Sequence, residues 1–510
     1  MDVRKGVKNI VYSILGQAIT MILGIVIPRL VIVSYGSEVN GLLTSVSQVI
    51  GYLALLEAGV GAAALQALYR PISDDNHDGI NAIISATHRY YRRTGIIYFA
   101  LTVVMSFVYP LVIKAELDYW FMAVIILICG IPNVINYFFQ GKLKIFLNAV
   151  GDNYILTNLS TITSVGASLA KIGLLLLGVN VIAVQAIYCV ISLVQMIFIY
   201  AYVKRKYPWI NVKVEPDNEA LTQKNSTLIH QVCGLVMNGT DVVVISVFCS
   251  LASASIYATY NMIYVLIFGI LTSITNGIAF IIGDAYCKDQ TRFNRIMEVY
   301  EAYFAGVVSA FMCTTYILIT PFISLYTTGA DLNYMDEYLP VLFSVLYIMN
   351  SLRYSSCAAI VAAGHFKQTQ HHAIIESVIN LSVSIVSVIA LNFIGCGIYG
   401  VLLGTIVALI YRNIVSIGYS NKHILQKKNL FSIKNIAVNA VMVAIVIVIG
   451  RFIKLDINNY VDWLVYAFIT TGIIFLGFIA AISVTNIKQF KEIYSYLCRK
   501  IKRKNSKENE

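Results

Sequence analysis

Long apolar runs restrict this sequence more than any other feature. Fourteen mostly apolar stretches, each at least 18 residues long, follow one another along the chain. About 20 apolar residues are needed for a helix to cross a bilayer, and only helices or closed barrels satisfy the backbone there. We therefore predict fourteen transmembrane helices, with approximate bounds 9–34, 39–68, 94–114, 119–141, 154–178, 180–203, 226–249, 253–283, 301–326, 337–361, 373–394, 397–419, 436–453 and 461–484.

The composition agrees with an all-α polytopic membrane protein. Of the 510 residues, 58% are apolar and only 12% are charged, whereas soluble chains carry about 25% charged residues. This excludes a large soluble enzyme and a disordered chain.

The nine cysteines contain no C-x-x-C pair and lie mostly alone in apolar runs. Neither a disulfide framework nor a metal site is predicted, and no cofactor is expected.

Basic residues alternate between the loops and predict the orientation. One set of alternating loops, with the C-terminal tail, carries 30 Lys and Arg, the opposite set carries three, and four lie inside predicted spans. This bias predicts that both termini face the cytoplasm. It also explains the net charge of +11 without nucleic-acid binding. The opposite loops are short, so no outer domain is predicted.

The first twelve spans are interpreted as two copies of a six-helix unit. After the second and eighth spans comes a polar turn and then an amphipathic stretch, which we predict to be a helix lying on the membrane surface. The apolar positions of the two stretches lie 213 residues apart: Ile80, Ile83 and Ile84 in one copy, and Phe293, Ile296 and Met297 in the other. An even number of spans makes the repeats parallel. The open alternative is coincidence between two amphipathic linkers.

This duplication predicts two lobes around a central cavity, an architecture suited to alternating access. Gly400 and Gly404 form a G-x-x-x-G pattern that we interpret as helix packing. The predicted parts are an N-terminal lobe at 1–203, a cytoplasmic linker at 204–225, a C-terminal lobe at 226–420, an extra hairpin at 436–484 and a basic tail at 485–510.

Four cations lie inside predicted spans and are candidate substrate-binding residues: Arg29, Lys171, Arg353 and Arg412. A charge at mid-bilayer costs about 2.5–3.5 kcal/mol on insertion scales, so it usually faces a cavity or a partner. A positive cavity suits an anion, and the planar fork of arginine suits phosphate. The alternatives are snorkelling to the membrane surface and structural pairing.

Two acids, Glu57 and Asp241, are candidate ion-coupling or cavity residues. Their alternative is a structural pairing with the cations. Asn238, Asn261 and Asn350 are candidate polar residues of a hydrated cavity. These amides could equally form hydrogen bonds between helices.

Two local patterns then resemble a known family. The first is Ile27-Pro28-Arg29-Leu30, continued by Tyr35-Gly36-Ser37-Glu38-Val39-Asn40-Gly41-Leu42 and Leu55-Leu56-Glu57-Ala58-Gly59-Val60-Gly61. The second is Asn238-Gly239-Thr240-Asp241-Val242-Val243-Val244-Ile245-Ser246. Both resemble bacterial polysaccharide repeat-unit flippases of the multidrug/oligosaccharidyl-lipid/polysaccharide exporter superfamily. The resemblance extends to Arg29 and Asp241 as matching positions.

The resemblance implies a protein of the bacterial cytoplasmic membrane that is not an enzyme and flips an undecaprenyl-pyrophosphate-linked oligosaccharide. Capsule, O-antigen or exopolysaccharide assembly would follow, with a polymerase and other assembly proteins as partners. The transported partner is then a lipid-linked anionic glycan among membrane lipids, and H⁺ or Na⁺ is the candidate coupling ion. The alternatives are a multidrug or metabolite exporter of the same superfamily, and a membrane glycosyltransferase or polymerase.

Overall fold

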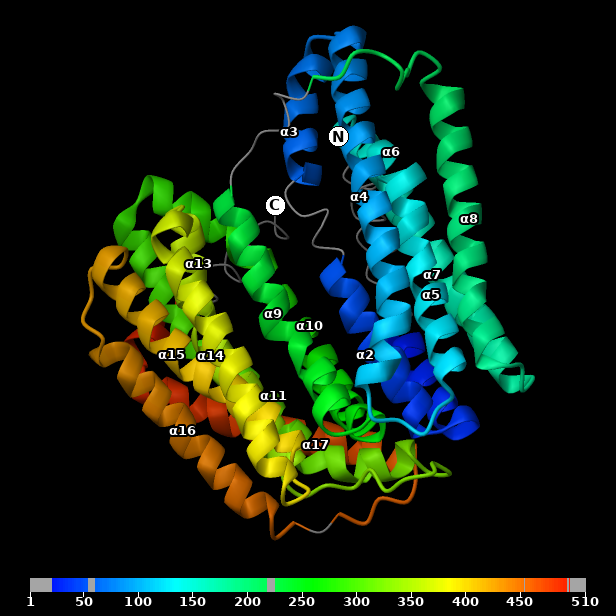
Figure 1. Ribbon diagram of the computed structural model, residues 1–510. Helices are drawn as coiled ribbons and strands as arrows, with labels where there is room; N and C mark the ends of the chain where they lie inside the picture. The colour runs from blue at the N-terminus through cyan, green and yellow to red at the C-terminus, as the bar shows by residue number, and fades with distance from the viewer. Residues whose placement is uncertain (1–20, 54–59, 218–224, 454, 493–494, 496–510) are drawn as a thin grey trace, which may run out of the picture. The chain divides into compact units, whose positions relative to one another are not determined.

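The computed structural model describes residues 21–53, 60–217, 225–453, 455–492 and 495 (Figure 1). Every regular element within these residues is a helix, which confirms the predicted all-α class. The chain divides into two compact units, which we describe separately.

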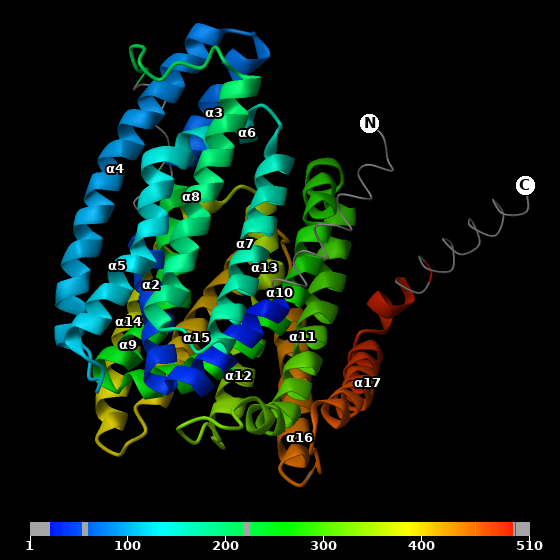
Figure 2. The ribbon, with the colours of Figure 1, turned by 90° about the vertical axis from the view of Figure 1, so that its right-hand side faces the viewer.

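Unit 1 comprises Met1–Thr259, Thr327–Asn333 and Val388–Val401. Its described helices are Met21–Tyr35, α2 (Ser37–Leu53), α3 (Val60–Ser73), α4 (His77–Val112), α5 (Tyr119–Ile135), the π-helical segment η2 (Asn136–Gln140), α6 (Gly141–Ala149), α7 (Asn153–Leu176), α8 (Val181–Lys206) and α9 (Asn225–Phe248). Figures 1 and 2 show α4, α5 and α8 as long neighbouring rods.

Unit 2 comprises Tyr260–Tyr326, Tyr334–Ser387 and Leu402–Glu510, so the division between the units passes through α10, α14 and α15. The helices of this part of the chain are α10 (Leu251–Lys288), α11 (Gln290–Tyr326), α12 (Leu339–Leu352), α13 (Tyr354–Ala362), α14 (Phe366–Asn392), α15 (Ile398–His423), α16 (Leu430–Gly450) and α17 (Tyr460–Thr485). The last two form the predicted C-terminal hairpin, and both pack on α11 (Figure 2).

Eleven helices within the described residues are long and apolar enough to cross a membrane. Each matches one of the fourteen predicted spans. The other three, at 9–34, 39–68 and 226–249, include residues whose backbone or side chains lie outside the description. The molecule is a multi-pass membrane protein, and the number fourteen stays a prediction.

The predicted surface-lying helices are wrong in one respect. Each amphipathic stretch is the first part of a long helix that continues into a span, α4 in one case and α11 in the other. Ile80, Ile83 and Ile84 are buried in a cluster with Phe146 and other apolar side chains of unit 1. Helical spacing reveals one apolar face but does not say whether lipid or protein covers it. Here protein covers it.

The helix order supports the duplication. The helices α4 and α11 begin 213 residues apart, and so do α7 and α14. The helix that follows α4 is interrupted by the π-helical segment η2, and the helix that follows α11 is interrupted at Arg353. An interruption thus occurs in the same element of each copy. The predicted bounds of the two lobes, the linker, the hairpin and the tail stay predictions.

Within unit 1, the N-terminus of α2 is held by a distant loop. Gly36, with φ of +89°, turns the chain before α2. The Ser37 amide lies 3.1 and 3.0 Å from the two carboxylate oxygens of Asp331, and the Ser37 hydroxyl donates to one of them at 2.5 Å. Farther along α2, a Cβ at Gly41 would overlap the carbonyl oxygen of Leu251. These contacts let the backbones of unit 1 approach closely.

The long helix α11 forms the centre of unit 2. Of its 37 residues, 18 are buried, and the helix packs against α12, α16 and α17. The Trp463 indole donates to the carbonyl of Leu318 at 3.0 Å, which ties α17 to α11. A Cβ at Gly306 would overlap the side chain of Ile482 on α17. These contacts hold one face of the hairpin against α11, while many apolar side chains of α16 and α17, such as Val448 and Phe468, are exposed.

Candidate functional site

The clearest charged cluster in the described residues lies in unit 2, at the interruption between α12 and α13. Arg353 occupies this junction, with φ of −86° and ψ of −9°. Its Nη1 donates to Oε1 of Glu376 on α14 at 2.6 Å, and its Nε donates to Oδ1 of Asn350 at 3.1 Å. Interrupted helices often form substrate sites in transporters. At this interruption Arg353, a candidate substrate-binding cation, contacts Asn350, a candidate polar residue of the cavity.

Arg412 on α15 joins the same cluster. Its Nε lies 3.4 Å from the second carboxylate oxygen of Glu376. The side chains of Arg412 and Glu376 are only 9% and 5% exposed, and that of Arg353 is 20% exposed. One carboxylate between two guanidinium groups leaves a formal charge of +1. A buried excess charge of this kind is costly and favours a further anion.

Glu376 was missed by the sequence reasoning, although it falls inside the predicted span 373–394. A carboxylate in a long apolar run was the signal that could have revealed it. Its presence reduces the predicted excess of cations within the spans. Arg353 and Arg412 are therefore paired with an acid, as the structural alternative expected, and the cluster still has one more cation than acid.

Lys171 lies in unit 1, whereas Arg353, Glu376 and Arg412 belong to unit 2. Its ammonium donates to Oε1 of Gln185 on α8 at 3.0 Å and lies 5.6 Å from the centre of the Tyr188 ring. Both partners are uncharged, so neither contact supplies a counter-ion to the ammonium. Arg29 is half-buried in the helix Met21–Tyr35.

Asp241 lies on α9 in unit 1 and is 8% exposed. The Tyr257 hydroxyl on α10 donates to its Oδ2 at 2.6 Å. Two residues before it, a Cβ at Gly239 would lie 3.0 Å from both Gln48 Oε1 and Tyr52 Oη, on α2. Asp241 thus occupies a polar, closely packed contact of three helices.

The remaining candidates are Asn261, Glu57 and Asn238. The Tyr347 hydroxyl donates to Oδ1 of Asn261 at 2.8 Å, which is the interhelical hydrogen bond that the alternative interpretation expected. Glu57 lies outside the described residues, and so does the side chain of Asn238. Among the described residues, no group of three or more His, Cys, Asp or Glu side chains could hold a metal ion.

Comparison with known proteins gives a fold. No protein-family model matches the sequence. No curated protein matches it either. A solved structure of the lipid II flippase MurJ, in an inward closed conformation, is similar with a TM-score of 0.66 at 15% identity, covering 94% of this chain and 100% of its own.

Two further solved structures are MATE transporters, one of which is described as a multidrug resistance transporter. An inward-facing MATE family transporter of the MOP superfamily is similar with a TM-score of 0.57 at 13% identity, covering 80% of this chain and 97% of its own. A point mutant of the Vibrio cholerae MATE transporter VcmN has a TM-score of 0.51 at 14% identity, covering 83% of this chain and 98% of its own. The chain therefore shares its fold with these three solved structures.

Proposed function

We propose that this chain is a flippase that moves an undecaprenyl-pyrophosphate-linked oligosaccharide across the bacterial cytoplasmic membrane. The transport would proceed by alternating access, with both termini in the cytoplasm, and would serve capsule, O-antigen or exopolysaccharide biosynthesis. The observation that carries the proposal is the likeness of nearly the whole chain to a lipid II flippase. The multidrug transporters match a smaller share of it.

The cluster of Arg353, Glu376 and Arg412 supports an anionic substrate. A guanidinium has five N–H donors, and the contacts described for Arg353 use its Nε and Nη1. The remaining donors suit the oxygens of a pyrophosphate. We propose Arg29 and Lys171 as further cations for the phosphates, and the amides of Asn238, Asn261 and Asn350 as polar residues along the substrate's path.

Coupling to an ion gradient is part of the same proposal. We propose Glu57 and Asp241 as the acids through which H⁺ or Na⁺ drives the conformational change, because carboxylates within spans often form the ion pathways and proton relays of transporters. A polysaccharide polymerase and other assembly proteins are the proposed partners beyond the transported glycan and membrane lipids.

The second candidate is a multidrug or metabolite exporter, which the two MATE structures favour. These transporters share the fold at similar identity, so the fold alone does not separate the substrates. A membrane glycosyltransferase or polymerase finds less support, because the similar structures are transporters.

Reconstitution into liposomes tests the proposal. The purified protein is incorporated with a fluorescent undecaprenyl-pyrophosphate-linked oligosaccharide, and an impermeant quencher reports the label that reaches the outer leaflet. We expect wild type and the exposed-site control Arg93→Gln to flip the lipid. Arg353→Gln/Arg412→Gln should lose most flipping, while Arg353→Lys/Arg412→Lys, which keeps the charge, should retain part of it.

The same vesicles loaded with a cationic dye test the alternative. Dye transport without movement of the labelled glycan lipid would overturn the flippase proposal and favour the exporter. Equal flipping by wild type and by the double Gln variant would leave the glycan proposal standing and remove the role proposed for the two arginines.

A further inference from the structure

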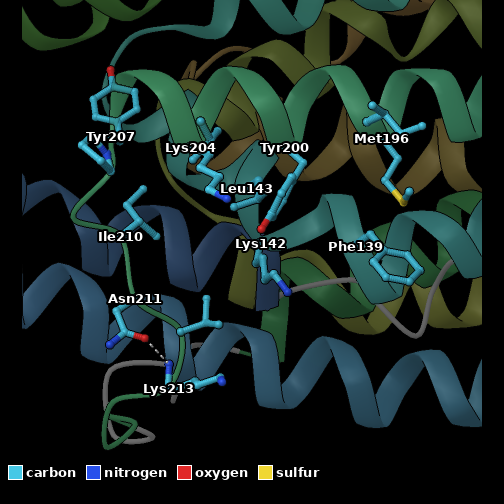
Figure 3. A pocket seen from close by; sticks show the side chains of 14 residues that line it. Phe139, Lys142, Leu143, Met196, Tyr200, Lys204, Tyr207, Ile210, Asn211 and Lys213 are labelled. Atoms are coloured by element: carbon cyan, nitrogen blue, oxygen red, sulfur yellow. Dashed lines mark hydrogen bonds between the residues drawn. The ribbon is translucent and has the colours of Figure 1, made fainter.

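A pocket of about 550 Å³ lies in unit 1, at the end that carries the basic linker (Figure 3). It is formed by η2, the start of α6, the last part of α8 and the linker that follows α8. Its volume falls within the range of small-ligand sites. The positive-inside bias predicts that this end faces the cytoplasm.

Three lysines line the pocket, and none of its described lining residues is acidic. Lys142 follows η2 and is half-buried, with its ammonium 2.8 Å from Nδ1 of His88. Lys204 lies in the last turn of α8 and Lys213 lies in the linker, and both are exposed. The pocket therefore concentrates positive charge from three separate segments.

The linker segment that carries Lys213 is held in place by α4. The backbone N–H of Asn211 donates to Oδ1 of Asn81 at 2.9 Å, and the Ser85 hydroxyl donates to the backbone carbonyl of Val214 at 2.7 Å. Asn211 in turn accepts a hydrogen bond from the Lys213 amide at 2.9 Å (Figure 3). The backbone of this wall is thus anchored on both sides of Lys213.

The pocket is also polarised along its length. Met196 and Lys204 are eight residues apart on α8, which corresponds to about 12 Å along a helix. Figure 3 shows Met196 and Phe139 at one end, with Lys204 and Lys213 toward the other. Phe139 and Ile197 are 52% and 61% exposed, so the apolar wall continues outward from the pocket.

We propose that this pocket binds an anionic glycerophospholipid of the leaflet on the linker side. The lysines meet the phosphate, and the start of an acyl chain lies against Phe139, Met196 and Ile197. A neutral lipid leaves the three lysines uncompensated, whereas a water-soluble anion leaves the apolar wall exposed. The chain's own basic tail is excluded because its charge has the same sign as the pocket's.

This site does not depend on the transported substrate, so its failure would leave the proposed function intact. The test uses the full-length protein in detergent, titrated with palmitoyl-oleoyl phosphatidylglycerol or with the matching phosphatidylcholine, and native mass spectrometry counts the bound lipids. Wild type should bind phosphatidylglycerol more tightly than phosphatidylcholine. Lys204→Gln/Lys213→Gln should bind phosphatidylglycerol about 30-fold more weakly.

The matched control is Lys422→Gln, because Lys422 is exposed in the last turn of α15 as Lys204 is in the last turn of α8. It should bind phosphatidylglycerol as wild type does. Lys204→Arg/Lys213→Arg should also keep wild-type binding, since it keeps both charges. Unchanged binding by the double Gln variant, or an equal loss in either control, would overturn the proposal.

Two more arms identify the occupant. Ile197→Ser should weaken phosphatidylglycerol binding if an acyl chain lies on the apolar wall, and unchanged binding contradicts the lipid. Inorganic phosphate should displace the lipid only weakly. Displacement by phosphate at the concentration at which unlabelled phosphatidylglycerol acts would mean that the pocket takes a free anion, and the lipid proposal would be wrong.

Discussion

The guanidinium of Arg353, which is 20% exposed, and the buried carboxylate of Glu376 form an ion pair, 2.6 Å between Nη1 and Oε1, across the 23 residues that separate them in the sequence. Arg412 contacts the same carboxylate from α15. One acid thus links an interrupted helix to two further helices of unit 2. This arrangement makes Glu376 the residue on which the two arginines depend.

Replacing Glu376 with glutamine should destabilise the protein by about 3–5 kcal/mol, because it leaves buried guanidinium groups without their counter-ion. Thermal unfolding of the purified protein in detergent measures the effect. Glu337→Gln is the control, since Glu337 is exposed in the preceding loop. Equal melting temperatures for Glu376→Gln and wild type would show that the pair contributes little.

Substitutions at Asp241 and Tyr257 test the charge of the acid and its hydrogen bond separately. Asp241→Asn keeps an acceptor for the Tyr257 hydroxyl and removes the charge, so we expect a folded protein that no longer responds to a proton or sodium gradient. Tyr257→Phe keeps the charge and should cost about 1–3 kcal/mol of stability. Gradient-driven transport in liposomes and thermal unfolding give the two readouts. Gradient-driven transport by Asp241→Asn would exclude this acid from coupling.

The Asp152 carboxylate, in the turn before α7, should make stability depend on acid pH. Burial raises the pKa of this group, but hydrogen bonds from Lys206, Tyr207 and Tyr202 outweigh burial and hold the pKa below its ordinary value of 3.8. A depressed pKa stabilises the folded state above about pH 4, and this contribution is lost as the pH falls through the folded-state value.

Asp152→Asn should therefore melt a few degrees below wild type at pH 7, and the difference should shrink below about pH 4. Asp456→Asn, at an exposed loop position, should match wild type throughout. Melting curves between pH 3 and pH 7 in an acid-stable detergent provide the comparison. A difference that stays constant down to pH 3 would rule out the carboxylate's charge as its cause.

Gly404 permits the close approach of α14 and α15. A Cβ at this position would overlap the backbone and hydroxyl of Ser384, whereas a Cβ at Gly418, on the same helix, meets nothing within 4 Å. Gly404→Val should therefore destabilise the protein by more than about 2 kcal/mol, and Gly418→Ala should be tolerated. Yields of monodisperse protein and melting temperatures compare the two. Similar behaviour of both variants would contradict the packing role predicted from the G-x-x-x-G pattern.

Much of the fold follows from the apolar runs. A bilayer offers no hydrogen-bond partners, so each long apolar run must satisfy its backbone within itself, and hydropathy alone predicts where such helices lie. This holds for α5, α7, α8 and the hairpin α16–α17. It failed at the start of α4 and α11, where the spacing of Ile80 and Phe293 was correct but the covering surface was protein instead of lipid.

Of the candidate site, the sequence predicted only which charged residues lie within spans, where a charge is energetically unfavourable. Charges in apolar runs drew attention to Arg353 and Arg412, because a lone charge in lipid is unfavourable wherever it lies. Their shared partner Glu376 was not identified, because no spacing rule says which face of α14 meets Arg353 and Arg412. Lys171 likewise has uncharged partners, Gln185 and Tyr188, that no spacing rule predicts.

The primary structure was therefore sufficient for the membrane class, the positions of most helices and the repeat, because these depend on local hydropathy and hydrogen bonding along one segment. Tertiary packing was needed to learn which charges meet, which apolar faces are covered and where three lysines converge. Those contacts depend on the rotation and interruption of helices whose residues lie far apart in the chain, as Arg353, Glu376 and Arg412 do.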